Sequence, residues 1–448
     1  MKLKRNVVMG IMAGALFLAA LTGPSVLANV VPASQVQLDA AMNKPLLLAG
    51  EKQTVWLRVG LTGFELESPE DRPPVNIAIV IDKSGSMGGE KISKAREAAI
   101  MAIQRLNAND IISVITYDST VNVLIPATKV AYKEALFQKI RQIGAGGSTA
   151  LFAGVSKGAD EMRKFLSENR VNRMVLLSDG LANVGPATPA ELGSLGTSLI
   201  KENISVTTIG LGLGYNEDLM TQLAYNSDGS HYFSENASDL AKAFDSEFGR
   251  ALSVIAQEVQ IQIDCFPGIR PIRLLGRDGD IYGQTVSVFV NHLYTKHEKF
   301  ILLEVEVPAG QKKETRKLAK VSVSYDNLQT KNRDKLSSEL EVKFTRDKNL
   351  VERRANAKVM VDVVELLAVE QNELALKLRD QGQVKEAQQV LINNAIFLES
   401  NAIQLNAPGL ATYGFEQRSD ADSMKDEVSY KKGRKSMRGS QSRRKQQQ

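Results

Sequence analysis

With 448 residues the chain is too long for one ordinary hydrophobic core, so two or three domains are expected. Its 43% hydrophobic and 24% charged residues are typical of a globular protein and exclude a chain without a sizeable core. The formal charge of +5 is unevenly spread, because residues 1–28 hold three bases, residues 430–448 hold eight, and neither stretch holds an acid. Residues 29–429 therefore combine 45 Lys and Arg with 51 Asp and Glu, a formal −6, so an acidic body precedes a basic end.

Residues 1–28 have the pattern of a secretory signal peptide. Three bases precede an apolar run from Val7 to Leu21, and Val26-Leu27-Ala28 places small residues at the cleavage positions. We therefore expect export to the periplasm, the cell surface or the extracellular space, with Asn29 as the first mature residue. The alternative is a retained anchor helix, but the run is short and interrupted by glycine. No other stretch is apolar enough to cross a membrane.

Residues 29–72 show the period of two that is typical of half-buried strands. Apolar and polar residues alternate from Val55 to Leu61, and a polar, proline-rich stretch from Ser68 to Pro74 follows. These strands have no partners of their own within the segment. We expect them to complete a β-sandwich that forms farther along the chain.

Residues 73–252 alternate between buried strands and amphipathic helices, which predicts an α/β sheet covered by helices on both sides. The apolar runs Val75–Ile81 and Arg173–Leu177 have the character of strands buried on both faces. Thr188-Pro189-Ala190-Glu191 has the capping-box pattern that starts a helix.

Residues 253–346 return to a period of two, with Gly and Asp turns between the runs, which predicts an antiparallel β-sandwich. If the strands of residues 29–72 complete it, the α/β unit is an insertion in this sandwich. Cys265 is the only cysteine of the sequence, so it makes no intramolecular disulfide, and we expect a small buried apolar side chain.

Residues 347–406 have helical periodicity on both sides of Gly382 and predict a helical hairpin. Residues 407–448 lose this periodicity, so we expect a disordered basic tail. The tail suits an anionic envelope surface, such as lipid or cell-wall polymer, while nucleic acid is not expected as a partner and a solvated end is the alternative. The bases of the tail are Lys431, Lys432, Arg434, Lys435, Arg438, Arg443, Arg444 and Lys445.

Three separate segments of the α/β unit carry oxygen ligands. Asp82-Lys83-Ser84-Gly85-Ser86 follows the first buried strand, Gly144–Thr149 is a glycine-rich loop that ends in a hydroxyl, and Ser178-Asp179-Gly180 follows the second buried strand. Carboxylate and hydroxyl oxygens suit Mg²⁺, Ca²⁺ or Mn²⁺ rather than zinc. Taken alone, the first segment is equally compatible with a turn that caps the helix starting near Glu90.

In order and spacing, the three segments resemble the metal-ion-dependent adhesion site of von Willebrand factor type A domains. The resemblance covers roughly residues 75 to 250 and implies a doubly wound, Rossmann-like sheet with strand order 3-2-1-4-5-6. In that order Asp82 and Asp179 end neighbouring strands at the switch point, where ligands of open α/β sheets bind. Asn183 and Gly185 either shape the rim of this site or form only the turn before the next helix.

The resemblance also implies a set of metal ligands. Ser84, Ser86 and Thr149 would bind Mg²⁺ (or Ca²⁺ or Mn²⁺) through their hydroxyls, while Asp82 and Asp179 would act directly or through water. The bound ion would then accept a carboxylate from a partner protein. A degenerate site that only supports the fold is the alternative.

The order of sandwich, α/β unit and helices looks loosely like inter-alpha-trypsin-inhibitor heavy chains and their bacterial relatives. We expect an exported cell-envelope protein that binds a protein partner through a divalent cation, as in cell adhesion. The alternative is a metal-stabilised scaffold on which an envelope complex or a partner enzyme assembles. No HExxH or Cys-His pattern is present, so we expect no enzymatic activity.

Overall fold

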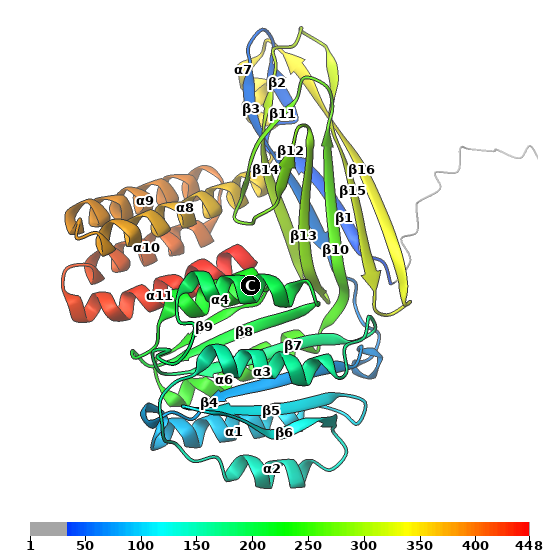
Figure 1. Ribbon diagram of the computed structural model, residues 1–448. Helices are drawn as coiled ribbons and strands as arrows, with labels where there is room; N and C mark the ends of the chain where they lie inside the picture. Colours follow the sequence, from blue (N-terminus) through cyan, green and yellow to red (C-terminus); the bar gives the residue numbers. More distant parts are fainter. Residues whose placement is uncertain (1–33, 448) are drawn as a thin grey trace, which may run out of the picture. The chain divides into compact units, whose positions relative to one another are not determined.

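A computed structural model describes residues 34–447 of the chain (Figure 1). The signal peptide predicted for residues 1–28 lies outside the described residues. Among the residues that are described, none of the helices combines the length and the hydropathy needed to cross a membrane.

The α/β unit is built on a six-stranded sheet with the order β6-β5-β4-β7-β8-β9. If β4 is counted as the first strand, this order is 3-2-1-4-5-6, which confirms the doubly wound sheet expected from the resemblance. All neighbours are parallel except β5 and β6. The strands are β4 (Val75–Asp82), β5 (Ile111–Tyr117), β6 (Val121–Lys129), β7 (Val171–Ser178), β8 (Ile204–Leu211) and β9 (His231–Ser234).

Helices cover both faces of this sheet, so β4, β5, β7 and β8 are mostly apolar and are buried along their whole length. One apolar cluster packs α1, α2 and α6 against one face, and a separate cluster packs α3, α4 and α5 against the other. The predicted capping box at Thr188 starts α4. The helices are α1 (Glu90–Gln104), α2 (Lys133–Arg141), α3 (Leu151–Arg163), α4 (Pro189–Ile200), α5 (Glu217–Asn226) and α6 (Leu240–Ala251).

Two further sheets form the sandwich, with the orders β1-β3-β14-β11 and β12-β13-β10-β15-β16-β2. Strand β3 pairs with β14 over its whole length, so strands from before the α/β unit lie in the same sheets as strands from after it. The strands are β1 (Gln37–Met42), β2 (Leu46–Leu48), β3 (Gln53–Thr62), β10 (Val254–Cys265), β11 (Arg270–Leu275), β12 (Asp280–Tyr282), β13 (Thr285–Tyr294), β14 (Glu298–Val307), β15 (Thr315–Asn327) and β16 (Asn332–Thr345).

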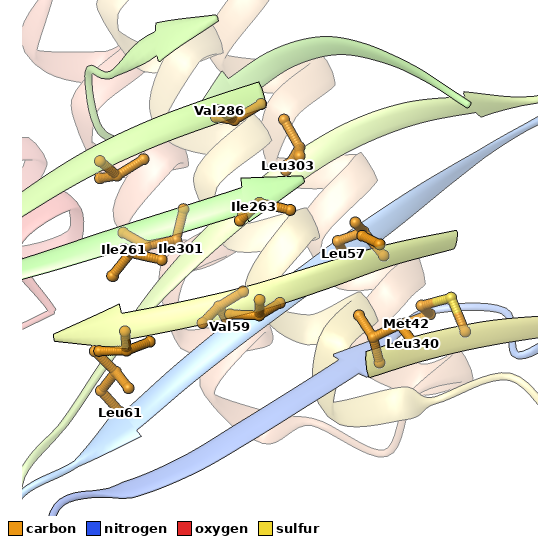
Figure 2. Close-up of a cluster of buried hydrophobic side chains, with 14 of the residues drawn as sticks. Met42, Leu57, Val59, Leu61, Ile261, Ile263, Val286, Ile301, Leu303 and Leu340 are labelled. Carbon is orange, nitrogen blue, oxygen red and sulfur yellow. The ribbon is translucent and has the colours of Figure 1, made fainter. Parts of the chain in front are cut away.

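Inward-facing aliphatic side chains of both sheets form the core of the sandwich. Figure 2 shows Leu57, Val59, Ile261 and Ile263 among them, at the alternate positions that the sequence pattern predicts. Cys265 is buried in the same cluster. The α/β unit enters between β3 and β10, as an insertion in the chain of the sandwich.

Strand β3 is not half-buried, although its alternating pattern is typical of a half-buried strand. Arg58, on the face opposite the core, is only 1% exposed because a helix of the C-terminal region covers it. Its guanidinium pairs with Asp362 at 2.5 Å and with Glu298 at 2.9 Å. Burial of this arginine therefore depends on carboxylates far away in the sequence.

The C-terminal region is helical almost to its end. Helices α8 and α9 form the hairpin expected around Gly382, whose φ of +82° suits the turn between them. The prediction of a disordered tail at residues 407–448 is wrong, because α10 and α11 occupy most of it. The helices are α7 (Lys348–Arg353), α8 (Ala357–Asp380), α9 (Val384–Gln404), α10 (Pro408–Ser423) and α11 (Glu427–Gln446).

Helix α11 is held mostly by charge rather than by a long apolar stripe, and for this reason its periodicity is weak in the sequence. Tyr430 and Met437 join a small apolar cluster with α8, α9 and α10. The helix also contacts α5 and β9 of the α/β unit, and Figure 1 shows it beside β9. Six of the eight bases pair with acids of this chain, so little of the expected free basic surface remains. They are Lys432, Arg434, Lys435, Arg438, Arg444 and Lys445.

A cluster of hydrogen-bonded polar side chains inside the helical region makes the stability of the fold depend on pH. Asn372 Nδ2 donates to Gln417 Oε1 at 2.9 Å and to Asp420 Oδ2 at 3.2 Å, and Gln441 Nε2 donates to Asn372 Oδ1 at 2.6 Å. Burial raises the pKa of Asp420 to about 7, and the nearby Glu416 adds to the rise, against the hydrogen bond from Asn372 and the charge of Arg444.

Asp420→Asn is expected to flatten the pH dependence of unfolding between pH 4 and pH 7. In that range the folded wild-type chain keeps a proton that the unfolded chain releases, so its free energy of unfolding falls as pH rises. Since Asp420 is partly exposed, we expect the free energy of unfolding of the wild-type chain to fall by about 2 kcal/mol over this range. The raised pKa would give a fall of roughly 4 kcal/mol if its full effect were felt. Urea unfolding between pH 4.5 and pH 8 measures this pH dependence of the free energy of unfolding. Asp422→Asn, on the exposed face of α10, is the control. Parallel curves for Asp420→Asn and wild type would contradict this expectation.

Candidate metal centre

The candidate site lies where the winding of the α/β sheet reverses. Asp82 is the last residue of β4, and Asp179 directly follows β7, the strand paired with β4. The helix after β4 packs on one face of the sheet, and the helix after β7 packs on the other. The loops at these two strand ends therefore diverge, and the space between them is where an open α/β sheet binds ligands.

Asp82 organises the first loop of the site. Its side chain is buried, Oδ1 accepts a hydrogen bond from the Ser84 backbone N–H at 2.8 Å, and Oδ2 accepts one from Ser178 Oγ at 2.7 Å. It does not cap helix α1, whose N-cap is Gly89 without a side-chain hydrogen bond. The carboxylate therefore ties the two strand ends together and turns the chain toward Ser86.

Three hydroxyls gather beside Asp179. Ser84 Oγ and Ser86 Oγ lie 3.1 Å apart, and Ser86 Oγ donates to Asp179 Oδ1 at 2.7 Å. A Cβ added to Gly180 would lie 3.1 Å from Thr149 Oγ1, 3.4 Å from Ser86 Oγ and 3.8 Å from Ser84 Oγ. All five residues proposed from the sequence are thus brought to one place.

The glycine-rich loop is locked onto the first loop by backbone hydrogen bonds. Gly85 N donates to Gly147 O at 3.0 Å, and Gly146 N donates to Lys83 O at 2.7 Å. Gly147 has a φ of +82°, and a Cβ there would come within 2.9 Å of Asp118, so this position requires glycine. These contacts fix the position from which Thr149 reaches the site.

Asn183 contributes to the structure of the site more than the sequence indicates. Thr149 N donates to Asn183 Oδ1 at 2.9 Å, and Asn183 N donates to Thr149 O at 3.1 Å. The side chain therefore holds Thr149 in place, whereas the sequence left open whether it only forms a turn. Its position three residues after Gly180, close to the second ligand segment, was the available signal.

Lys91, in the first turn of α1, is a further residue of the site that the sequence reasoning missed. Its ammonium contacts Asp179 Oδ2, and this carboxylate is buried. The positive charge of Lys91 thus already offsets the negative charge of Asp179, one of the two acids of the site. Nothing in the motif identifies this lysine, because the contact depends on how α1 leaves the loop.

The charges of the site fit a hard cation. Burial raises the pKa of Asp82 and the charge of Asp179 adds to the rise, against hydrogen bonds from Ser84 and Ser178. Two adjoining carboxylates in a nearly buried position favour a positive partner, and the hydroxyl oxygens complete a ligand set of the type that Mg²⁺ and Ca²⁺ take. Ser86 is exposed, so the set is open to solvent on that side.

Comparison with known proteins identifies the α/β unit. The profile of the von Willebrand factor type A domain matches residues 76–246. A Synechocystis sp. protein described as uncharacterized protein sll0103 is 27% identical over 60% of this chain and 66% of its own length. Inter-alpha-trypsin inhibitor heavy chain H3 of Rattus norvegicus is 28% identical over 36% of this chain and 19% of its own. The chain thus spans less than two thirds of these relatives.

Solved structures show that the likeness extends beyond residues 76–246. A von Willebrand factor type A structure from Catenulispora acidiphila has a TM-score of 0.69 at 17% identity and covers 87% of this chain and 90% of its own. The ArnB paralog VWA2 from Sulfolobus acidocaldarius has a TM-score of 0.61 at 19% identity, covering 90% and 97%. These similarities concern the fold, and with the sequence matches they confirm the likeness to von Willebrand factor type A domains and to inter-alpha-trypsin inhibitor heavy chains.

Proposed function

Residues 76–246 of this chain are a von Willebrand factor type A domain, and from this premise we propose that the chain binds a protein partner through a divalent cation. The observation that carries the proposal is the gathering of three hydroxyls beside Asp82 and Asp179 at the switch point of the sheet. Domains of this family typically act in protein interaction and adhesion. Five residues would hold the ion, namely Asp82, Ser84, Ser86, Thr149 and Asp179.

The residues of the chain determine what kind of ligand is attracted. When bound, Mg²⁺ (or Ca²⁺ or Mn²⁺) supplies a Lewis-acidic position for an additional oxygen ligand. The three hydroxyls are neutral, so they position the ion without cancelling its charge, and only two carboxylates offset it. Lys91 adds a positive charge beside Asp179. A site with this balance favours a carboxylate from a partner, and the exposed side near Ser86 leaves room for it.

We propose a binding role rather than a catalytic one. The histidines, the usual general bases, are engaged elsewhere: His231 hydrogen-bonds to Thr208, His292 contacts Arg173, and His297 contacts the backbone of Gln447. Location in the cell envelope, after export, is the second part of the proposal and rests on the sequence pattern of residues 1–28. A metal-stabilised assembly scaffold remains the alternative function.

The experiment is a pull-down from envelope extract with the immobilised chain in Mg²⁺, in EDTA, and in EDTA followed by excess Mg²⁺. Cation-dependent adhesion predicts a partner that is captured in Mg²⁺, lost in EDTA and regained when Mg²⁺ returns. A partner that stays bound in EDTA would contradict adhesion through the ion and favour the scaffold.

A further inference from the structure

Three large apolar side chains stand exposed on the loops that flank the candidate site. Leu181 is 60% exposed, Val184 is 38% exposed and Leu213 is 37% exposed, whereas Asp179 is only 1% exposed. Leu181 and Val184 lie on the loop after β7, and Leu213 lies on the loop after β8. We refer to Leu181, Val184 and Leu213 as the apolar rim.

Backbone contacts place each residue of the rim at the site. Leu181 follows Gly180, whose missing side chain is surrounded by the three hydroxyls. Val184 N donates to the carbonyl of Thr149 at 3.3 Å. Leu213 precedes Gly214, where an added Cβ would lie 2.6 Å from the carbonyl oxygen of Asp179. Two loops from neighbouring strands thus bring aliphatic residues to the backbone next to Asp179 and Thr149.

The charge beside the rim is positive. Lys91 contacts Asp179, and its ammonium would lie 3.8 Å from a Cβ added to Gly212, one residue before Leu213. With a divalent cation on the two carboxylates, Lys91 leaves an excess of positive charge beside the aliphatic side chains. An occupant of this surface must therefore combine a negative group with apolar area.

We propose that the site recognises a protein segment in which an aspartate or glutamate stands next to a large aliphatic or aromatic residue. The carboxylate completes the ligands of the cation, and the adjacent side chain packs on Leu181 and Leu213, with Val184 at the border. Single exposed apolar residues are ordinary on protein surfaces, but here three of them lie on the two loops that flank one polar site, as in interfaces where an apolar contact adjoins a specific polar one. This inference rests on the proposed cation-dependent binding and names the class of partner.

The test uses a phage-displayed library of random peptides, selected on the immobilised chain in Mg²⁺ and eluted with EDTA. The eluted sequences are expected to share an acidic residue beside Leu, Ile, Val, Phe or Tyr. A synthetic peptide of the selected sequence is then titrated against wild type and against the double variant Leu181→Ser/Leu213→Ser, with at least tenfold weaker binding expected for the variant.

The matched control is Phe415→Ser/Val428→Ser, which removes two apolar side chains that are even more exposed, from α10 and α11 (73% and 78% exposed), and is expected to bind like wild type. Eluted peptides whose acid has no apolar neighbour, or a rim variant that binds unchanged, would overturn the inference and leave cation-dependent binding intact. The absence of any peptide that EDTA elutes would overturn both.

Discussion

Asp82→Asn is expected to weaken divalent-cation binding by at least about a hundredfold, roughly 2.7 kcal/mol, with little change in the fold. The substitution removes one of the two negative charges of the site but keeps the size of the side chain. The amide oxygen is still able to accept from the Ser84 backbone N–H, and the Ser178 hydroxyl is able to turn and accept from the amide.

The expected stability of this variant separates lost binding from unfolding. Burial and the neighbouring Asp179 raise the pKa of Asp82, so the ionised carboxylate is costly in the fold without a cation. A neutral amide relieves that cost, and the cation-free variant should unfold at the same urea concentration as wild type or a slightly higher one. Titration calorimetry with Mg²⁺ and Mn²⁺ measures the affinity, and thermal unfolding with and without the ion measures the linked stabilisation.

Asp118→Asn is the matched control, because Asp118 pairs with Lys83 beside the site but is not among the proposed ligands. Its cation affinity should stay within about threefold of wild type, a change of roughly 0.7 kcal/mol. If Asp82→Asn binds Mg²⁺ as tightly as Asp118→Asn does, the proposed ligand set is wrong.

Glu217→Gln is expected to destabilise the chain by about 3 kcal/mol or more, although the residue lies outside the candidate site. Glu217 pairs with Lys435 and Arg434 of α11, and Lys435 is only 2% exposed. Lys435 Nζ also donates to the carbonyl of Tyr215 at 2.6 Å and lies 4.1 Å from the centre of its ring. Without the carboxylate, the ammonium stays buried with only neutral oxygens and an aromatic ring to balance its charge.

The double variant Glu217→Gln/Lys435→Met should recover much of that loss. Removing one partner of a buried ion pair leaves an uncompensated charge, whereas replacing the charged partner with an apolar side chain of similar length does not. Urea unfolding of both variants measures the difference. Lys432→Gln, which breaks the exposed pair with Glu235, is the control and should change stability by less than about 0.5 kcal/mol. A loss below about 1 kcal/mol for Glu217→Gln would show that α11 is not held by this pair.

The sequence by itself determined the α/β unit and the candidate ligands. Strands buried on both faces are mostly apolar and lack a strict alternation, so β4 and β7 are recognisable, and Asp82 and Asp179 stand out at their ends. Parallel strands in this order bring their carboxyl ends to one edge, so Asp82 and Asp179 meet there as a consequence of topology. The alternating pattern of β3 likewise marked it as a sandwich strand, because a core on one face imposes a period of two.

The tertiary structure alone decided the surroundings of the site and the end of the chain. Lys91, Leu181 and Leu213 meet around Asp179 only through the paths of two loops and the direction of α1, which no local pattern encodes. Helix α11 has little apolar periodicity, so it resembles a disordered basic segment until Glu217, Asp218 and Asp380 are placed against Arg434. Periodicity records which face of an element is buried, whereas ion pairs between distant segments leave no such record. A basic helix is therefore predictable only when its acidic partners are known.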